Sequence, residues 1–333
     1  MLRAIRQTDH RPALRVGIGL AVPGAVLLAA GRPELLVYAV FGSFVGMFGR
    51  GQPPGARLRQ QAIATVRLGV AVVVGLVLAW YDADPRAIAL CTVLYAAAAS
   101  WAAERVGLRP AVPFFGVLGL GSLAALPQSQ VDLLLALAIY GATAALSLGI
   151  GQLTRLGILG TRRVVPGPGS APPVEAAEAR WRALGYGVSV ALASAAALGF
   201  GVGHVGWAAA AATVPLAAAT LRGRVGRGIE CFVGTVAGLV IAALLLLPAF
   251  PLTVKALLVI VLLVPTESFM AKNYGLALGF FTPLILLMTD LSAPATPLQL
   301  VSDRLIGTGL GVVAGIAVAA LLHPYEGRGG RRG

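Results

Sequence analysis

The sequence predicts an all-α polytopic membrane protein with about twelve transmembrane helices, arranged as two parallel six-helix repeats. Three observations lead to this fold class. Apolar residues make up 58% of the chain and charged residues only 12%, with a mean hydropathy of +0.86. Apolar windows recur along the whole length, and similar motifs return about 170 residues apart. A water-soluble globular domain does not have this composition.

The apolar windows divide evenly between the two halves of the chain. The first half has windows near 14–30, 35–49, 62–81, 87–103, 111–126 and 131–152. The second half has windows near 183–201, 206–221, 230–248, 252–270, 274–289 and 301–322. Several are shorter than the ~20 residues that an α-helix needs to cross ~30 Å of hydrocarbon. Glycines interrupt some of them, which predicts broken or tilted helices.

The first window has the composition of a signal peptide, because basic residues precede the apolar run 16–28. However, Gly17 and Gly31 match Gly187 and Gly201 in the middle of the chain. An internal copy is not a cleaved leader. The first window is therefore predicted to be the first transmembrane helix.

The repeats set the predicted domain boundaries. Residues 1–152 form the first six-helix repeat and residues 183–324 the second. Between them, a Pro/Gly-rich cytoplasmic linker covers 153–182 and ends in a helical segment from Glu175 to Arg182. Residues 325–333 form a basic C-terminal tail. An even number of spans per repeat gives both copies the same orientation.

The distribution of positive charge predicts the topology. With both termini cytoplasmic, all lysines and arginines except Arg32, Arg86, Lys255 and Arg304 fall on the cytoplasmic side. This asymmetry is the one that orients membrane proteins. The predicted location is the cytoplasmic (inner) membrane of a bacterium, in multi-pass form, with the lipid bilayer as the partner.

No enzymatic function is expected. The histidines His10, His204 and His323 are scattered with no second metal ligand nearby, and neither lysine belongs to a Walker A motif. A GxGxxG pattern at 201–206 lacks the strand that a dinucleotide site requires. No cofactor, metal or catalytic residue is therefore predicted. The basic residues occur in short clusters between apolar runs, which also argues against a nucleic-acid partner.

The stretch 221–239 contains the densest basic cluster, with Arg222, Arg224 and Arg227, before a helix predicted to begin at Glu230. In the first half Arg57 corresponds to Arg227. Topology determinants that contact lipid headgroups explain such a cluster. The alternative is an electropositive cytoplasmic vestibule that concentrates anions.

Two Gly-Thr-x-x-Gly segments place small residues on one helix face, which allows helices to approach closely in lipid. The alternative is a substrate path. The residues concerned are Gly234, Thr235, Gly238, Gly307, Thr308 and Gly311.

A few charged residues lie within apolar windows, where a charge costs about 3 kcal/mol on insertion scales. Arg304 follows Asp303, so it either contacts an anion, is compensated by its neighbour or extends toward the outer surface. Arg67 lies near an inner helix end and is a further candidate for the anion path. Glu267 is the better candidate for proton coupling, followed by Asp303.

Two stretches, Thr220–Leu239 and Asp303–Pro324, resemble the fusaric acid resistance protein-like family. The pattern is followed over 183–324 and only loosely in the first half. The resemblance implies export of aromatic carboxylic acids or related organic anions across a bacterial inner membrane. It also implies that Arg227 and Arg304 lie near a pore. Plant aluminium-activated malate channels are similar distant relatives with a dimeric, cation-lined pore. The twelve-helix chain is therefore expected to form a pseudo-dimer, and a homodimer stays open as a further assembly.

The predicted function is an inner-membrane transporter that exports small organic anions through the interface of two repeats. A passive organic-anion channel and a non-transporting scaffold or accessory subunit stay open as alternatives. Substrate identity, direction and energy source are left undetermined by these residues.

Overall fold

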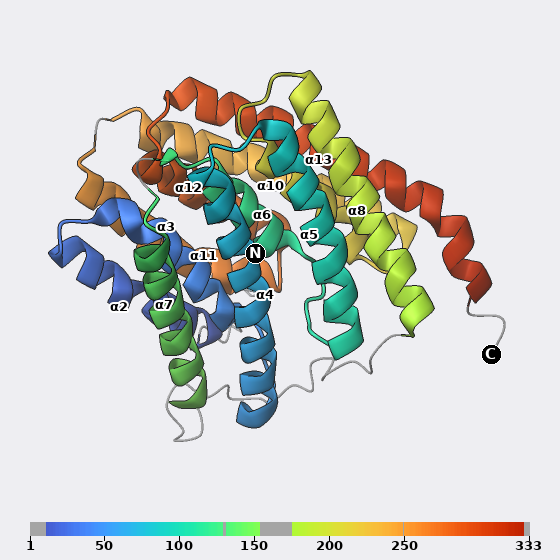
Figure 1. The fold of residues 1–333 in the computed structure, drawn as a ribbon, viewed down its shortest axis with the longest axis horizontal. Helices are drawn as coiled ribbons and strands as arrows, with labels where there is room; N and C mark the ends of the chain where they lie inside the picture. The colour runs from blue at the N-terminus through green and yellow to red at the C-terminus, as the bar shows by residue number, and fades with distance from the viewer. Residues whose placement is uncertain (1–10, 129–130, 154–174, 249, 330–333) are drawn as a thin grey trace. The chain divides into compact units, whose positions relative to one another are not determined.

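The computed structural model describes residues 11–128, 131–153, 175–248 and 250–329, with side chains as far as Leu322. All regular secondary structure in these ranges is helical (Figure 1). Nine helices within them are long and apolar enough to cross a membrane. They are α2 (Arg11–Ala29), α4 (Pro54–Trp80), α5 (Pro85–Val106), α7 (Leu133–Leu153), α8 (Ala176–Gly199), α10 (Leu221–Leu246), α11 (Leu252–Met270), α12 (Tyr274–Ser292) and α13 (Pro297–Gly329). The chain is a multi-pass membrane protein.

Three further apolar segments are shorter. They are Pro33–Met47, which contains η1 (Pro33–Leu35), α3 (Leu36–Ser43) and η2 (Phe44–Met47); α6 (Phe114–Ala124); and Val205–Ala217, which contains α9 (Val205–Thr213) and η5 (Pro215–Ala217). They coincide with three of the predicted windows. An eleven-residue helix such as α6 is only about 16 Å long, so the prediction of about twelve full-length spans is not confirmed.

The linker predicted over 153–182 lies mostly outside the described residues, as does the basic N-terminus before Arg11. The described end of the linker is the beginning of α8, which continues unbroken into its apolar part. The first residues of the predicted tail belong to the end of α13, and residues 330–333 are outside the described chain.

The structure consists of two compact units, and each takes helices from both halves of the chain. Unit 1 contains α2, α3, α7, α11 and α12, with α4 as far as Val66 and α10 from Gly238. Unit 2 contains α5, α6, α8, α9 and α13, with the remainder of α4 and α10. These units do not coincide with the two sequence repeats, 1–152 and 183–324, whose boundaries stay predictions.

In unit 1, α2 packs against α11, and α3 packs against α12. Small residues make the first contact close, because a Cβ atom on Gly17 would lie 2.7 Å from a methyl group of Val264. Phe44, just after α3, lies 6.1 Å from Phe281 of α12 between ring centroids. A Cβ on Gly42 would lie 2.7 Å from the Cβ of Thr143, so α7 is also packed tightly against α3. Such close approach gives the dispersion contacts that hold helices together in lipid.

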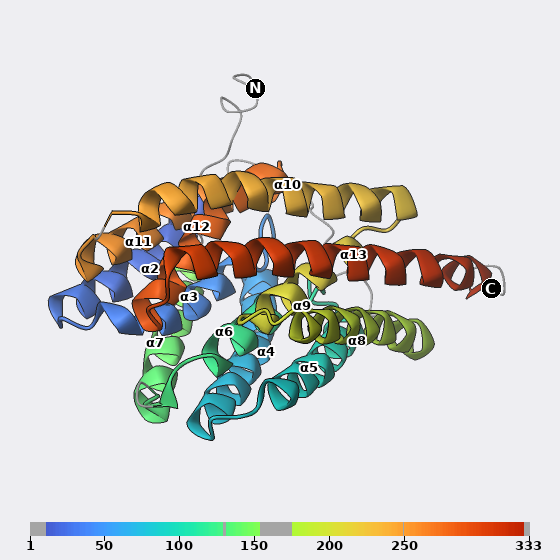
Figure 2. The ribbon, with the colours of Figure 1, turned by 90° about the horizontal axis from the view of Figure 1, so that it is seen from above.

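In unit 2, α8 packs against α5 (Figure 1), and α9 packs against α6 (Figure 2). Helix α13 lies along both α8 and α9 (Figure 2). Glycines again set the distance, since a Cβ on Gly121 of α6 would lie 2.6 Å from the Cα of Gly206 of α9. In unit 1, the first two helices of the first half (α2, α3) pack against α11 and α12 of the second half. In unit 2, the first two helices of the second half (α8, α9) pack in the same way against α5 and α6 of the first half.

Apolar side chains remain exposed in stripes along the long helices. On α4 the stripe consists of Val66, Val70, Val73 and Val77, each more than a third exposed. Their spacing of three and four residues places them on one helix face. An apolar face of this length is unfavourable in water but suits contact with lipid chains.

Candidate functional site

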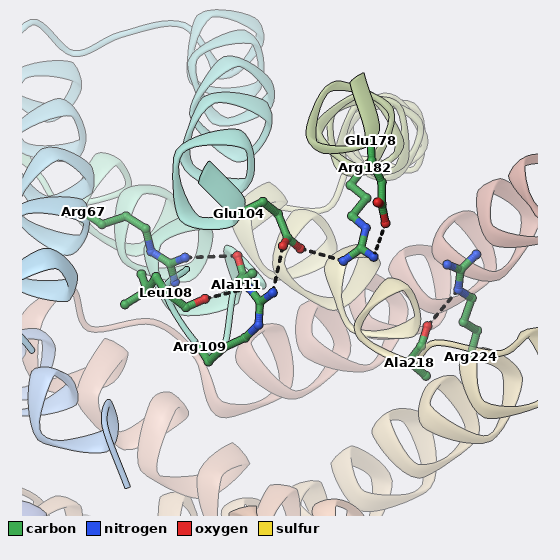
Figure 3. Close-up of polar contacts among 9 residues, drawn as sticks. All are labelled: Arg67, Glu104, Leu108, Arg109, Ala111, Glu178, Arg182, Ala218 and Arg224. Atoms are coloured by element: carbon green, nitrogen blue, oxygen red, sulfur yellow. Dashed lines mark hydrogen bonds and ion pairs between the residues drawn. The ribbon is translucent and has the colours of Figure 1, made fainter. Parts of the chain in front are cut away.

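One buried glutamate of unit 2, Glu104, lies between Arg109 and Arg182, with Arg67 and Arg224 farther out on either side (Figure 3). We call Arg67, Arg109, Arg182 and Arg224, together with Glu104, the unit 2 cluster. Its members come from α4, from the turn after α5, and from the first turns of α8 and α10. Two segments far apart in sequence, those of Arg109 and Arg182, therefore meet at the carboxylate of Glu104 on α5.

Two of these arginines bind Glu104 directly. The carboxylate lies 2.9 Å from Arg182 and 3.1 Å from Arg109. Gly107 ends α5 in the left-handed conformation, with φ of 68°, and the chain then turns so that Arg109 returns to the helix end. Arg182 also contacts Glu178 on its own helix, at 2.6 Å. Charge-assisted bonds of this kind are the stronger ones in proteins.

Arg67 and Arg224 bind backbone carbonyls instead. The guanidinium of Arg67 donates to the carbonyls of Ala111 and Val112, at 3.1 and 3.0 Å. Arg224 donates to the carbonyl of Ala218 at 2.9 Å. Carbonyl groups accept these hydrogen bonds without carrying a net charge.

Two buried tyrosines show that these groups are close together. Tyr186 of α8 interacts electrostatically with Glu104, Arg182, Arg224 and Arg67. On the side of α4, the hydroxyl of Tyr95 donates to the carbonyl of Arg67 at 2.9 Å. The cluster therefore combines positive charge with aromatic side chains.

The carboxylates of Glu104 and Glu178 contact Arg109 and Arg182 of the unit 2 cluster. Arg67, Glu104 and Arg224 are buried, with less than a tenth of each residue exposed. Charges act over longer distances in such surroundings than in water.

The start of α10 differs from the sequence-based prediction. The helix begins at Leu221 and not at Glu230, because the hydroxyl of Thr220 caps it by accepting a hydrogen bond from the backbone of Gly223 at 3.1 Å. The arginines of this stretch therefore lie on the helix and point to different sides. Arg224 is buried in the unit 2 cluster, whereas Arg227 is partly exposed and contacts Glu230 at 3.4 Å.

The bonding of Arg57 resembles that of Arg224 rather than that of Arg227. In unit 1, Arg57 donates to the carbonyl of Gln52 in the preceding turn and to the carbonyl of Gly151 on α7. Arg224 binds the turn before α10 and, at 3.5 Å, the carbonyl of Ala319 on α13. The two arginines thus fasten the starts of α4 and α10.

Arg304 lies apart from this cluster in sequence and in contacts. It is buried on α13, with 3% of its surface exposed, and its guanidinium lies 5.6 Å from the ring centre of Trp207. The adjacent Asp303 is hydrogen-bonded to His204, with 2.8 Å between its Oδ2 atom and the Nδ1 atom of the imidazole. The candidates Arg304 and Arg224 therefore occupy different surroundings within unit 2.

Glu267 is enclosed in unit 1. Its carboxylate is fully buried and forms an ion pair with Arg50, which lies in the turn before α4. Apart from this pair, neither oxygen has a hydrogen-bond partner among the described residues. Burial and the charge of Arg15 lower the pKa of Arg50 to about 10, so the guanidinium remains charged at neutral pH.

The glycines of the Gly-Thr-x-x-Gly segments lie on buried helix faces. A Cβ on Gly311 would be 2.8 Å from the Cβ of Ala211, and one on Gly238 would be 2.7 Å from the Cβ of Thr282. Gly307 has room for ordinary contact. The remaining members, Gly234, Thr235 and Thr308, are also buried.

Sequence reasoning missed the role of Glu104, Arg109, Arg182 and His204. Arg109 and Arg182 were counted with the cytoplasmic charges, and no periodicity links Glu104 with Arg182 across two predicted helices. His204 was read as isolated because its partner follows 99 residues later. Within the described ranges, no three His, Cys, Asp or Glu side chains are grouped so that they could hold a metal ion.

Comparison with known proteins gives one match. Residues 191–318 match the family model described as fusaric acid resistance protein-like. This range runs from the middle of α8 into α13 and contains both stretches on which the resemblance was based. No curated protein matches the chain, and no solved structure does. Over residues 191–318, which are less than half of the chain, the sequence is therefore similar to the fusaric acid resistance protein-like family.

Proposed function

We propose that this protein exports small organic anions, of the aromatic carboxylate type, across a bacterial inner membrane. The unit 2 cluster is the observation that carries the proposal. It brings Arg109 and Arg182 to the one buried carboxylate of Glu104, and a substrate carboxylate would compete with Glu104 for these two guanidinium groups. Guanidinium groups bind carboxylates through paired, directional hydrogen bonds. The neighbouring Tyr95 and Tyr186 suit an aromatic substrate.

The proposed architecture has twelve membrane segments in two parallel six-segment repeats, with both termini in the cytoplasm. The exchange of halves between the units supports it. In unit 1, α2 and α3 of the first half pack against α11 and α12 of the second. In unit 2, α8 and α9 of the second half pack against α5 and α6 of the first. In this arrangement the repeats meet inside each unit, and the unit 2 cluster lies at one such meeting point, between α5 and α8.

The distribution of charge supports a cytoplasmic entrance. Glu104, Arg109, Arg182 and Arg224 all belong to helix ends predicted to face the cytoplasm. A cluster of this sign at the entrance raises the local concentration of anions, which favours loading from the side where acids are made.

Flux of radiolabelled benzoate from proteoliposomes tests the proposal. Arg182→Gln and Arg109→Gln are expected to lower benzoate flux at least about tenfold, since each removes a charged partner. Arg86→Gln is the matched control, because Arg86 is an exposed arginine of the same unit outside the cluster. Wild-type protein that is folded and moves no acid would exclude the transporter and favour a scaffold or accessory subunit.

A passive organic-anion channel is the second candidate. It is favoured by the ion pair between Glu267 and Arg50, since the carboxylate predicted to couple protons is already engaged. In a channel, an imposed pH gradient does not drive benzoate uphill. Accumulation against its own gradient, lost in Glu267→Gln, would exclude the channel and identify a proton-coupled carrier.

A further inference from the structure

Four side chains of unit 1 each carry a buried oxygen atom that has no hydrogen-bond partner among the described residues. Three of them are almost fully buried: Thr143 and Ser147 of α7 and Gln61 of α4 are 1%, 4% and 2% exposed. The fourth, Gln152, lies at the end of α7, where its amide nitrogen donates to the carbonyl of Pro54 at 3.2 Å and its amide oxygen stays unbonded. We call these four residues the α7 polar line. A buried polar atom without a partner is unfavourable, and a bound water or ion is the common explanation for one.

The two hydroxyl groups of this line differ from other helical hydroxyl groups of the same unit. Thr266, Ser268 and Thr289 each donate to the carbonyl group four residues earlier, at 2.8, 2.8 and 2.9 Å. A bond of this kind satisfies the hydroxyl group within its own helix. The hydroxyl oxygens of Thr143 and Ser147 form no such bond. They are therefore available to a bound molecule.

The members of the α7 polar line follow one another along α7. Thr143, Ser147 and Gly151 are spaced four residues apart, so they lie on one face of the helix. The amide oxygen of Gln61 lies beside this face, because it would be 2.6 Å from a Cβ atom on Gly151. The helix rises about 13 Å from Thr143 to Gln152. The line thus extends from the middle of α7 to the end that is predicted to face the cytoplasm.

The line is enclosed by protein and does not face lipid. The hydroxyl oxygen of Ser147 would lie 3.1 Å from a Cβ atom on Gly19 of α2, and its Cβ atom 3.9 Å from one on Gly46 of η2. The side chain of Thr143 packs on Gly42 of α3. Glycines of neighbouring segments therefore leave space for these polar side chains inside unit 1.

Tyr140 marks the inner limit of the line. Its side chain is buried, and its hydroxyl group donates to the carbonyl of Thr65 on α4 at 2.7 Å. From Leu133 to Ile139, α7 contains only apolar residues. The unbonded oxygens therefore lead into unit 1 from one end of α7 only.

The chemistry of the line indicates which molecule it binds. Amide oxygens only accept hydrogen bonds, whereas hydroxyl groups donate or accept them. A carboxylate has only acceptors and cannot satisfy the amide oxygens. A cation would lie close to the guanidinium of Arg57, which donates to the carbonyl of Gly151 at 2.9 Å, and like charges repel. Water is small and neutral, and it donates two hydrogen bonds.

We propose that the α7 polar line binds a row of water molecules, which enters unit 1 at the predicted cytoplasmic end of α7 and stops at Tyr140. Unit 1 then has a hydrated half-channel that is closed on its far side. This inference goes beyond the proposed function, because it concerns a different unit and does not depend on anion transport.

X-ray footprinting of the full chain in lipid nanodiscs tests the inference. Radiolysis of a bound water produces a hydroxyl radical that oxidises a neighbouring thiol, and mass spectrometry measures the oxidised fraction. In a background without the native cysteines (Cys91→Ser, Cys231→Ala), Ser147→Cys and Thr143→Cys should be oxidised at least about fivefold faster than two buried controls.

The controls are chosen from the same unit. Ser43→Cys replaces a fully buried serine whose hydroxyl group donates to the carbonyl of Val40 at 2.7 Å. Ala136→Cys places a thiol on α7 beyond Tyr140, at a position that is 0% exposed. Equal oxidation rates at Ser147→Cys, Thr143→Cys and Ser43→Cys would overturn the row of waters. Rapid oxidation of Ala136→Cys would overturn the closure at Tyr140.

A stability measurement decides the question if a cysteine variant does not fold. Gln61→Met removes the amide and keeps a side chain of similar length. If the amide oxygen is hydrated, the melting temperature in detergent should fall, because a satisfied hydrogen bond is lost. If the oxygen is dry, the melting temperature should rise, because an unsatisfied buried group is removed, and the proposal would be overturned. Neither measurement uses benzoate, so a negative result leaves the proposed function intact.

Discussion

The Nδ1 atom of His204 lies 2.8 Å from the Oδ2 atom of Asp303. His204 precedes α9, and Asp303 belongs to the first turns of α13. The imidazole also stacks on Trp207, with ring centres 4.2 Å apart and planes inclined by 10°. Arg304 lies near the same indole. These contacts attach the turn between α8 and α9 to the beginning of α13.

A double-mutant cycle measures this attachment. His204→Ala and Asp303→Ala each remove the hydrogen bond, so the double variant should be destabilised by about 1 kcal/mol less than the sum of the single variants. Unfolding in mixed micelles with increasing sodium dodecyl sulfate provides the free energies. Strictly additive effects would show that the two side chains do not interact.

Arg304 separates a packing role from an anion role. Removal of its guanidinium in Arg304→Ala is expected to lower the free energy of unfolding by about 1–2 kcal/mol, because the contact with Trp207 is lost from a buried site. Arg304→Lys keeps the charge and should restore most of that stability. If Arg304 also contacts the substrate, benzoate flux per folded molecule falls in Arg304→Ala. Unchanged flux per folded molecule would limit the residue to packing.

Two glycines on α13 provide a matched test of helix packing. A Cβ on Gly311 would collide with Ala208 and Ala211, whereas one on Gly309 would lie 3.5 Å from the ring of Phe232, an ordinary contact distance. Gly311→Ala should therefore destabilise unit 2 by about 1–3 kcal/mol through overpacking. Gly309→Ala should have little effect. Equal losses would mean that α13 moves aside at little cost, and the melting temperature in detergent compares the two.

Glu104 is expected to oppose substrate binding in the unit 2 cluster. Glu104→Gln raises the local positive charge, so the KM for benzoate should fall roughly threefold to tenfold, provided the variant folds. Glu178→Gln is the control, since Glu178 contacts the same Arg182 from an exposed position. A KM that rises in Glu104→Gln would mean that Glu104 positions the arginines and does not compete with the substrate.

The membrane class and most spans could be predicted from sequence, because composition and periodicity depend on each segment alone. The beginning of α10 was predicted wrongly, at Glu230 instead of Leu221, because the prediction followed apolar content alone. Apolar content begins near Glu230, but the helix follows its cap at Thr220, and arginines are compatible with a helix that extends beyond the hydrocarbon. The three short segments were also predicted as apolar windows. Their helices are shorter than the windows because the helices end within them, which hydropathy alone does not reveal.

The sites were harder to predict, because they depend on contacts between distant segments. Arg67 and Arg224 were candidates for the anion path, and the structure places both in the unit 2 cluster. Arg227 was a candidate of equal standing, yet it lies on another face of the same helix. Glu104 and Arg182 lie 78 positions apart, and only the packing of α5 against α8 brings them together.

The composition of the two units has a consequence for biosynthesis. Unit 1 requires α11 and α12, and unit 2 requires α13, so neither has all its helices until the segments after residue 252 have been synthesised. Until then, the glycine-rich faces of the helices inserted first have no packing partner in the bilayer. A product truncated after the first half would hold α5 without α8, and Glu104 without Arg182. In such a fragment, a charge that is buried in the folded protein would be exposed to lipid. We expect membrane proteases to degrade it.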